Sequence, residues 1–291
     1  MTDQMTGKTC IVSGASSGIG LETAVGLAKL GALVVMTSRN QAKGESALTY
    51  VKNRSGSDNV ELMLVDFASL ASIRGFVEEF KMGHDRLDVL VNNAGGINTS
   101  RSETLDGFET TFGVNHLGYF LLTNLLLDML KTSAPSRVVS VSSRAHLRPK
   151  GMNFDDLNSE QSFSAMGSYG ESKLANVLFT YELSRRLEGT GVTANCLHPG
   201  VVRSGFAQNN GGLVALAVKA FYTLGRPFTK SSVQGAQTSI YLASSPELEG
   251  VTGKYFDNSA ETPSSRASHD EEEQRRLWEI SEQMTGLVVS A

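Results

Sequence analysis

The chain has 291 residues, of which 40% are hydrophobic and 19% charged, and its formal net charge is -4. A chain of this size and composition can bury a full core, which excludes a disordered tail or a disulfide-stapled mini-protein. The weakly acidic balance disfavours nucleic acid and anionic membranes as partners. Because we find neither a leader-like start nor an apolar run of about 18 residues, we expect no membrane anchor and a soluble, cytoplasmic protein.

The chain holds two cysteines, Cys10 and Cys196, and 29 glycines against 6 prolines. Two cysteines are too few for a secreted framework and lack metal-ligand spacing. We therefore expect a reducing compartment, apolar packing of both thiols and no metal site. The glycine excess indicates a fold that needs bare backbone at particular positions.

Short apolar runs alternate along the chain with longer segments of helical periodicity. This alternation predicts right-handed crossovers and a parallel sheet covered on both faces. The expected fold is therefore α/β: a single-domain, doubly wound, Rossmann-like parallel sheet over residues 1–291. We expect strands at 8–14, 32–38, 60–66, 87–93, 137–143, 192–198 and 253–257, and helices that begin near Gly18, Asn40, Ser69, Thr111, Ser168 and Ser231.

Three segments fall outside this alternation. Residues 144–167 and 205–230 follow the carboxyl ends of strands, where open α/β sheets bind ligands. We expect both segments to wall a substrate pocket and 205–230 to act as its lid, and an apolar run inside this lid indicates an apolar substrate. The charged end, 262–291, is expected to form a helix and tail that dock through Leu277 and Trp278.

The first expected strand is followed by Ser-Gly-Ala-Ser-Ser-Gly-Ile-Gly at 13–20 and then by a helix. Glycines allow a sharp turn and a close approach of the backbone to a pyrophosphate, while the helix start presents N–H groups to negative charge. The G-x3-G-x-G spacing departs from the standard dinucleotide fingerprint, but the flanking strand and helix are those that the fingerprint requires. The candidate cofactor-binding residues of this loop are Gly14, Ser16, Ser17, Gly18, Ile19 and Gly20.

The ends of the next strands extend this candidate cofactor site. Ser38 and Arg39 stand where NAD enzymes carry an acidic residue for the ribose hydroxyls. Because a guanidinium can bind a phosphate through a planar fork of donors, these residues predict NADP(H) rather than NAD(H). Asp66, followed by Phe67, either accepts hydrogen bonds from an adenine amino group or caps the third strand. After the fourth strand, small residues let the backbone pass close to the cofactor at Asn93, Ala94 and Gly95.

Tyr169 and Lys173 are four residues apart on an expected helix, so their side chains share one face. An adjacent ammonium favours the phenolate of a tyrosine, whose pKa is otherwise about 10. Such a pair can donate and accept a proton when a carbonyl and an alcohol interconvert.

Together, these motifs resemble the short-chain dehydrogenase/reductase family over nearly the whole chain. NFDDLN at 153–158 and SKLANVLF at 172–179 resemble the retinol-dehydrogenase-like branch of that family. Members of this branch frequently carry membrane anchors, a feature that we do not find here. The resemblance to the family rests on GASSGIG at 14–20, Asp66, NNAG at 92–95, Asn115 in VNHLG, VSS at 141–143, YGESK at 169–173 and HPG at 198–200.

The resemblance implies roles for the matching residues. Tyr169 would be the general acid/base, and Lys173 would lower its pKa and hold the nicotinamide ribose. Ser143 would orient the substrate oxygen, with the neighbouring Ser142 as the second choice. Asn115 would distort its helix and hold a water of a proton relay that starts at Lys173. The cofactor carboxamide would dock on the loop after the sixth strand, at Pro199, Gly200, Val202 and Ser204.

The expected function is that of an NADP(H)-dependent oxidoreductase, which interconverts an apolar ketone or aldehyde and its alcohol as a carbonyl reductase does. Two alternatives stay open: an oxidising retinol- or steroid-type dehydrogenase, and a non-catalytic NADP-binding sensor. The apolar helices at 111–131 and 168–187 either form the seam of a homodimer or homotetramer or are buried within one chain. We assign none of the five histidines to catalysis, and only His146, just beyond Ser143, could reach substrate.

Overall fold

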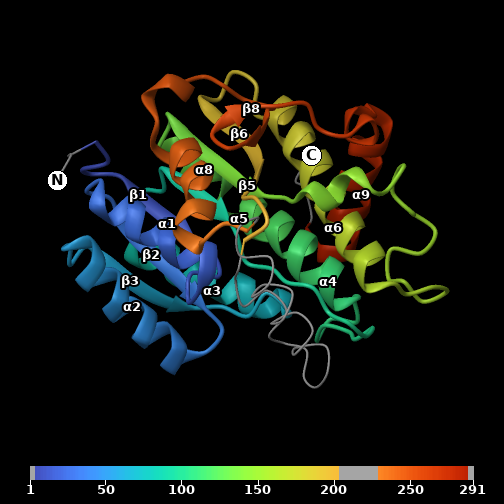
Figure 1. The fold of residues 1–291 in the computed structure, drawn as a ribbon, viewed down its shortest axis with the longest axis horizontal. Helices are drawn as coiled ribbons and strands as arrows, with labels where there is room; N and C mark the ends of the chain where they lie inside the picture. Colours follow the sequence, from blue (N-terminus) through green and yellow to red (C-terminus); the bar gives the residue numbers. More distant parts are fainter. Residues whose placement is uncertain (1–3, 203–228, 288–291) are drawn as a thin grey trace.

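The structure is a computed structural model that describes residues 4–202 and 229–287. Its sheet has eight strands in the order β3-β2-β1-β4-β5-β6-β7-β8, and all neighbours are parallel except β7 and β8. The prediction of a doubly wound α/β fold is confirmed (Figure 1). The strands are β1 Thr9–Val12, β2 Leu33–Ser38, β3 Val60–Leu64, β4 Val89–Asn92, β5 Ser136–Val141, β6 Val192–His198, β7 Tyr255–Asp257 and β8 Ala260–Glu261.

Most of the strands are linked by helices, which begin close to the expected positions. The exception is α6, which starts before Ser168 because the Ser164 side chain caps it by accepting a hydrogen bond from the Gly167 N–H. The α-helices are α1 Gly18–Lys29, α2 Gln41–Ser55, α3 Leu70–Gly83, α4 Thr110–Phe112, α5 Gly118–Thr132, α6 Ala165–Arg186, α8 Ser232–Ser244 and α9 Glu271–Thr285. Shorter elements are the π-helical turn η1 Gly113–Leu117 and the 3-10 turns η2 Arg144–Leu147, η5 Pro246–Leu248 and η6 Arg266–His269.

The sheet separates two hydrophobic cores. On one face, α1 packs against both α2 and α8, and Figure 1 shows α1 and α8 side by side in front of the sheet. On the other face, α5 packs against α3, and α6 packs against α9. Successive residues of β1 serve opposite cores, because Ile11 belongs to the second while Cys10 and Val12 belong to the first. Both faces of the central strands are therefore covered.

The two cysteines pack among apolar residues as expected, Cys10 in the first of these cores and Cys196 in a smaller cluster with Val177, Tyr181 and Tyr255. Cys10 and Cys196 are fully buried and form no disulfide. Burial raises the pKa of both thiols, which therefore stay protonated and pack as small apolar groups.

The C-terminal helix α9 docks through Leu277 and Trp278, which are 1% and 4% exposed. The Trp278 ring centre lies 4.9 Å from that of Phe120 and 5.7 Å from that of Phe179. Because Phe120 belongs to α5 and Phe179 to α6, the chain's own terminus covers part of the apolar face of these two helices.

The short strand β8 was not predicted from the sequence. β8 follows a turn at Asn258 and Ser259, whose φ angles are 54° and 59°, and this turn reverses the chain so that β8 runs antiparallel to β7. Within residues 4–202 and 229–287, none of the helices combines the length and apolarity needed to cross a membrane.

Candidate active site

The expected site residues meet at the carboxyl edge of the sheet. Ser13, at the end of β1, uses its Oγ to accept hydrogen bonds from the backbone N–H groups of Asn93 (2.8 Å) and Ala94 (2.9 Å). The Asn93 Nδ2 in turn donates to the Ser13 carbonyl at 2.8 Å. The glycine-rich loop and the segment after β4 therefore form one continuous surface.

The loop glycines are required by this close approach. Gly14 and Gly18 have φ angles of 63° and 62°, in the left-handed region that favours glycine. A Cβ atom at Gly14 would lie 2.7 Å from the Ala94 Cα, and one at Gly20 would collide with the Asn93 Nδ2. The predicted cofactor loop is thus held against the strand beside it.

The start of α1 differs from that of five other long helices, and α5 continues directly from η1 without a free first turn. At α2, α3, α6, α8 and α9 a side-chain oxygen accepts a hydrogen bond from a backbone N–H, whereas Ser17 provides no such cap at α1. N–H groups in a first helical turn have no partner within the helix, and the helix dipole favours an anion there. The loop from Ser16 to Gly20 therefore fits the pyrophosphate of the expected dinucleotide.

The end of β2 presents Arg39 rather than Ser38. Ser38 is 4% exposed, and its hydroxyl donates to the Asn40 carbonyl at 2.9 Å and accepts from the Asn40 N–H at 3.2 Å. Arg39 is exposed. A ribose phosphate at this strand end would meet the Arg39 guanidinium, while the Ser38 hydroxyl supports the turn.

Asp66 and Phe67 both have structural tasks at the end of β3. One Asp66 oxygen accepts a hydrogen bond from the Ala68 N–H at 3.0 Å, so the strand-cap interpretation applies whether or not the acid also meets an adenine. Phe67 is 8% exposed and packs so closely on α5 that a Cβ atom at Gly118 would lie 2.7 Å from its ring. The Phe67 side chain is therefore part of the hydrophobic core on the α5 face of the sheet.

The loop after β6 begins with Pro199 and Gly200, whose φ angle of 92° again requires glycine. Val202 then forms a parallel bridge with Lys230. Ser204 lies outside the described residues, and so does nearly all of the expected lid, including the apolar run that suggested an apolar substrate.

Asn115 lies in the π-helical turn η1, which confirms the expected distortion of its helix. π turns recur at functional sites. The Asn115 Nδ2 donates to the Gly96 carbonyl at 2.9 Å and to the Ser172 Oγ at 3.0 Å, while its Oδ1 accepts from the Gly96 N–H at 2.9 Å. A Cβ atom at Gly95 would lie 2.7 Å from this Oδ1. Asn115 thus joins the segment after β4 to α6.

Lys173 is 4% exposed and sits between two phenol rings. Its Nζ donates to the Val141 carbonyl at 2.9 Å and lies 5.7 Å from the ring centre of Tyr119 and 5.8 Å from that of Tyr169. Burial lowers the pKa of Lys173 to about 7. The predicted pairing of Tyr169 with Lys173 along α6 is therefore present, with the lysine deeper in the protein.

Two neighbours of this pair, Tyr119 and Ser172, were not predicted from the sequence. Tyr119 resembles another apolar residue of α5, yet its buried hydroxyl faces no hydrogen-bond partner among the described residues. Burial, with Tyr169 as a lesser cause, raises the pKa of Tyr119. Ser172 donates to the Tyr169 carbonyl at 2.9 Å and accepts from Asn115. The position of Ser172 between Tyr169 and Lys173 in YGESK could have indicated that its hydroxyl lies in the site.

Of the two candidate serines, Ser143 is the more accessible. The Ser142 hydroxyl is buried and donates to the Lys173 carbonyl at 2.8 Å, so it anchors α6 and is not available to a substrate. Ser143 is partly exposed and begins η2, where its Oγ accepts from the Ala145 N–H at 3.2 Å.

The interpretation that His146 could reach substrate is wrong. His146 is 1% exposed, and its ring faces away from solvent with Nδ1 2.6 Å from the Ser143 carbonyl. The 3-10 turn η2 folds this side chain back into the protein beside Tyr255, whose ring centre is 4.7 Å away.

The buried lysine predicts a pH dependence of stability. In the cofactor-free protein, the free energy of unfolding should rise between pH 7 and about 8.5, because the unfolded chain still holds the proton that folded Lys173 gives up near its lowered pKa of about 7. Below that pKa both states are protonated and the penalty is constant. The slope should reach at most about 1.36 kcal/mol per pH unit.

Urea denaturation across this window measures the slope, and Lys173→Met should flatten it. The lowered histidine pKa values start from 6.5 and the raised cysteine and tyrosine values from 9.0 and 10.0, so those groups titrate mainly outside the window. Burial raises the pKa of Glu171 to about 7, so this carboxyl also titrates at the lower end of the window, and it is retained in Lys173→Met. An unchanged slope in Lys173→Met would contradict the assignment.

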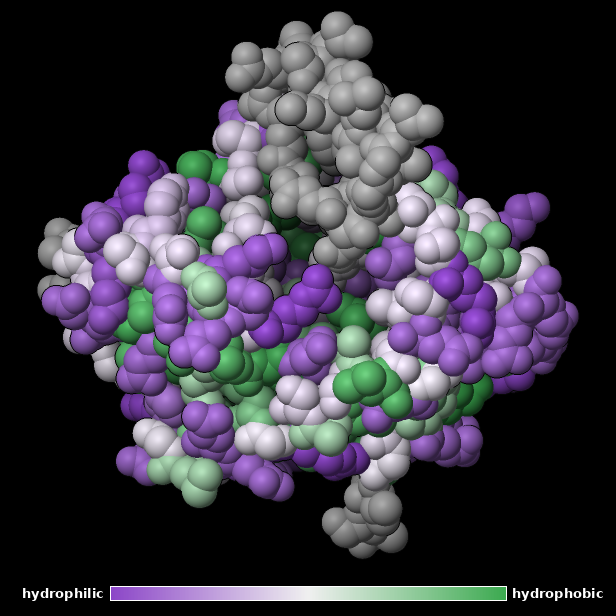
Figure 2. Space-filling view, turned by 90° about the horizontal axis from the view of Figure 1, so that it is seen from below, coloured by the Kyte–Doolittle hydropathy of each residue, from purple (hydrophilic) through white to green (hydrophobic). Residues whose placement is uncertain are grey.

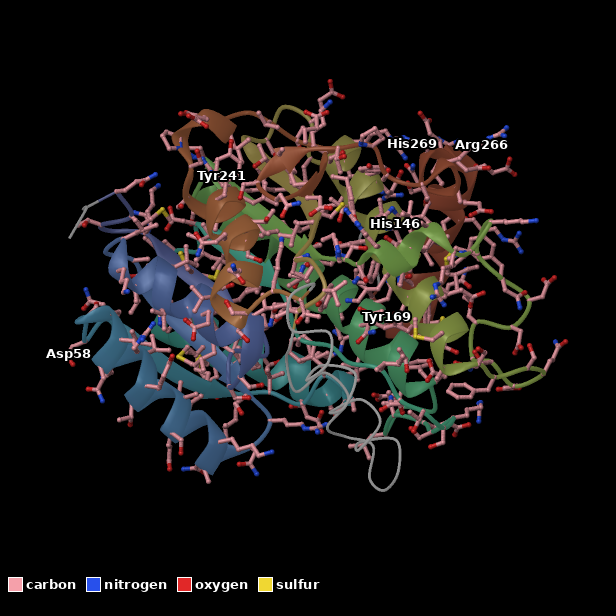
Figure 3. The ribbon with its side chains drawn as sticks, viewed as in Figure 1. Asp58, His146, Tyr169, Tyr241, Arg266 and His269 are labelled. Carbon is pink, nitrogen blue, oxygen red and sulfur yellow. The ribbon has the colours of Figure 1, made fainter. Side chains whose placement is uncertain are left out.

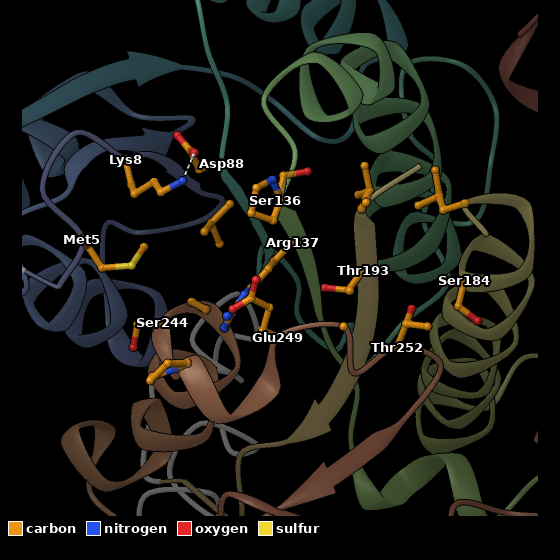
Figure 4. A pocket seen from close by; sticks show the side chains of 18 of the residues that line it. Met5, Lys8, Asp88, Ser136, Arg137, Ser184, Thr193, Ser244, Glu249 and Thr252 are labelled. Atoms are coloured by element: carbon orange, nitrogen blue, oxygen red, sulfur yellow. Dashed lines mark hydrogen bonds and ion pairs between the residues drawn. The ribbon is translucent and has the colours of Figure 1, made fainter. Parts of the chain in front are cut away.

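A separate cleft of about 740 Å³ lies at the opposite edge of the sheet (Figure 4). It opens at the amino ends of β1, β4, β5 and β6, and its lining includes Lys8, Asp88, Arg137 and Thr193. Lys8 and Asp88 form an ion pair at 2.9 Å across part of it. None of the predicted catalytic residues lines this cleft, so we give it no part in the reaction.

Comparison with known proteins agrees with the geometry of the carboxyl edge. The family described as short chain dehydrogenase matches residues 8–212. The chain is 49% identical to human retinol dehydrogenase 14 over 98% of its own length and 88% of that protein. It is 44% identical to human polyprenol dehydrogenase over 97% of its length and 86% of that protein.

Among solved structures, an uncharacterized protein from Mycobacterium paratuberculosis is similar at a TM-score of 0.78 and 34% identity. That similarity covers 97% of this chain and 94% of the other. The chain therefore belongs to the short-chain dehydrogenase family of oxidoreductases, in its retinol-dehydrogenase-like branch.

Proposed function

We propose that the protein is an NADP(H)-dependent oxidoreductase that interconverts an apolar alcohol of the isoprenoid type and its aldehyde. The observation that carries the proposal is the arrangement on α6, where the Lys173 Nζ lies 5.8 Å from the Tyr169 ring centre beside the Asn115 network. The relatives named retinol dehydrogenase and polyprenol dehydrogenase favour the retinol-type alternative over a general carbonyl reductase.

In this proposal, the nicotinamide cofactor supplies or accepts the hydride, and the protein handles the proton and the geometry. Ser143 holds the substrate oxygen. Tyr169 donates a proton to that oxygen in reduction and takes it back in oxidation. In its protonated form, Lys173 stabilises the phenolate of Tyr169, while Asn115 keeps η1 beside the lysine.

An apolar substrate is supported by the described residues around the reacting groups. Leu147, Met166 and Val201 are 55%, 40% and 51% exposed. Leu147 follows Ser143, Met166 precedes Tyr169 by one helical turn, and Val201 follows Gly200. The view from below shows a hollow in the surface with hydrophobic residues at its wall (Figure 2). Exposed apolar side chains around a recess are a common mark of ligand sites.

Turnover by the purified protein tests this function. We expect NADPH-dependent reduction of all-trans-retinal and NADP-dependent oxidation of all-trans-retinol, followed by chromatography of the product, with a kcat/KM well above that for short-chain ketones. Cofactor binding without turnover of any substrate would instead favour the sensor alternative. A preference for short-chain ketones would favour a general carbonyl reductase.

Arg39→Ala should weaken NADPH binding by about 10- to 100-fold, because a hydrogen bond to a charged group contributes roughly 1.5–3 kcal/mol. NADH lacks the ribose phosphate, so its Kd should change less than about 3-fold. Arg54→Ala removes a cation from the opposite end of α2 and serves as the control. Fluorescence titration measures each Kd, and a wild-type kcat/KM with NADH equal to that with NADPH would overturn the cofactor assignment.

A further inference from the structure

His146 joins the serine at the end of β5 to the C-terminal part of the chain. Its Nδ1 lies 2.6 Å from the Ser143 carbonyl oxygen, and its Nε2 lies 3.1 Å from the Ser265 backbone nitrogen. In Figure 3, His146 lies between Tyr169 and the η6 residues Arg266 and His269. The imidazole thus bridges two segments that are far apart in sequence.

The two contacts assign the protonation of the ring. A backbone N–H can only donate, so the Nε2 must accept from Ser265, and the proton sits on Nδ1, from which it is donated to the Ser143 carbonyl. The imidazole is therefore neutral. Burial lowers the pKa of His146, which agrees with this tautomer.

These contacts fix the backbone of Ser143. Its carbonyl oxygen accepts from both the His146 N–H at 3.0 Å and the His146 Nδ1, and its Oγ accepts from the Ala145 N–H. The same turn packs on α6 directly after Tyr169, since a Cβ atom at Gly170 would lie 3.2 Å from the Ala145 carbonyl oxygen. The position of η2 therefore sets how Ser143 faces Tyr169.

We propose that His146 is a positioning residue for the reaction: its neutral ring anchors η2 to the C-terminal segment and so orients the Ser143 hydroxyl toward the substrate oxygen. This inference rests on the proposed function, in which Ser143 holds that oxygen. The ring itself touches neither substrate nor cofactor.

Three variants test the proposal in retinal reduction with NADPH. His146→Leu keeps the bulk but removes both hydrogen bonds, and it should lower kcat about 10-fold with the Kd of NADPH unchanged. His146→Asn puts an amide N–H near the position of Nδ1 but no acceptor at the position of Nε2, so it should restore only part of this loss. His269→Leu is the matched control, because His269 touches Tyr181 and Ser264 but not Ser143, and kcat should stay within about 2-fold of wild type.

The deciding measurement repeats His146→Leu in a Ser143→Ala background. If the ring acts through the serine hydroxyl, it should cause no further loss of kcat there. An equal fractional loss in both backgrounds would overturn the role of His146 alone. An undiminished kcat in Ser143→Ala itself would instead contradict the proposed reaction, and the two failures are thereby distinguished.

Discussion

Tyr169→Phe should lower kcat by about 10²- to 10⁴-fold, the range that a positioned acid or base contributes. The substitution removes the one group that moves a proton in the proposed reaction and leaves the ring beside Lys173. NADPH binding should survive, because the cofactor loop at 14–20 is held by contacts with the segment after β4. Stopped-flow NADPH oxidation and fluorescence titration separate these two effects.

Tyr119→Phe is the matched control for that experiment. Its ring also lies beside Lys173, at 5.7 Å, but its hydroxyl has no hydrogen-bond partner among the described residues. Removing this oxygen should change kcat less than about 3-fold, since it forms no described bond that would be lost. A Tyr169→Phe protein that keeps more than a few per cent of kcat would contradict the assignment of Tyr169 as the general acid/base.

Local patterns in the sequence predicted most of the fold and the cofactor loop. Alternation of buried positions and the helix caps at Asn40, Ser69 and Ser231 determine where strands and helices begin, and these signals are read within a few residues. β8 has no such signal, because its existence depends on the left-handed turn at Asn258 and Ser259.

Parts of the candidate site were predicted where the spacing of residues within one motif determines which side chains lie together. The helical spacing of Tyr169 and Lys173 is such a case, whereas the distortion of the helix at Asn115 was expected from the family resemblance. The bond between His146 and Ser265 spans 119 positions, so no local pattern could reveal it. Contacts between residues so far apart in sequence depend on how the C-terminal segment packs, and the hydrophobic periodicity of the sequence does not specify that packing.

That packing leads to the largest expected effect on stability. Trp278→Ala should lower the free energy of unfolding by about 3–5 kcal/mol, the usual cost of truncating a buried aromatic residue. The side chain is 4% exposed, contacts the rings of Phe120 and Phe179, and donates from Nε1 to Glu282 at 2.6 Å. Truncation would open a cavity between α9 and both helices beneath it.

Arg275→Ala, on the solvated side of the same helix, is the control. Its exposed pair with Glu271, at 3.2 Å, should contribute less than about 0.5 kcal/mol. Urea denaturation of the three proteins provides the comparison. A large loss in Trp278→Ala would mean that α9 is part of the core. Ser281 of the same helix also bonds His116 in η1, the turn that carries Asn115, at 2.9 Å. A loss below about 1 kcal/mol would mean that α9 is only attached to the surface.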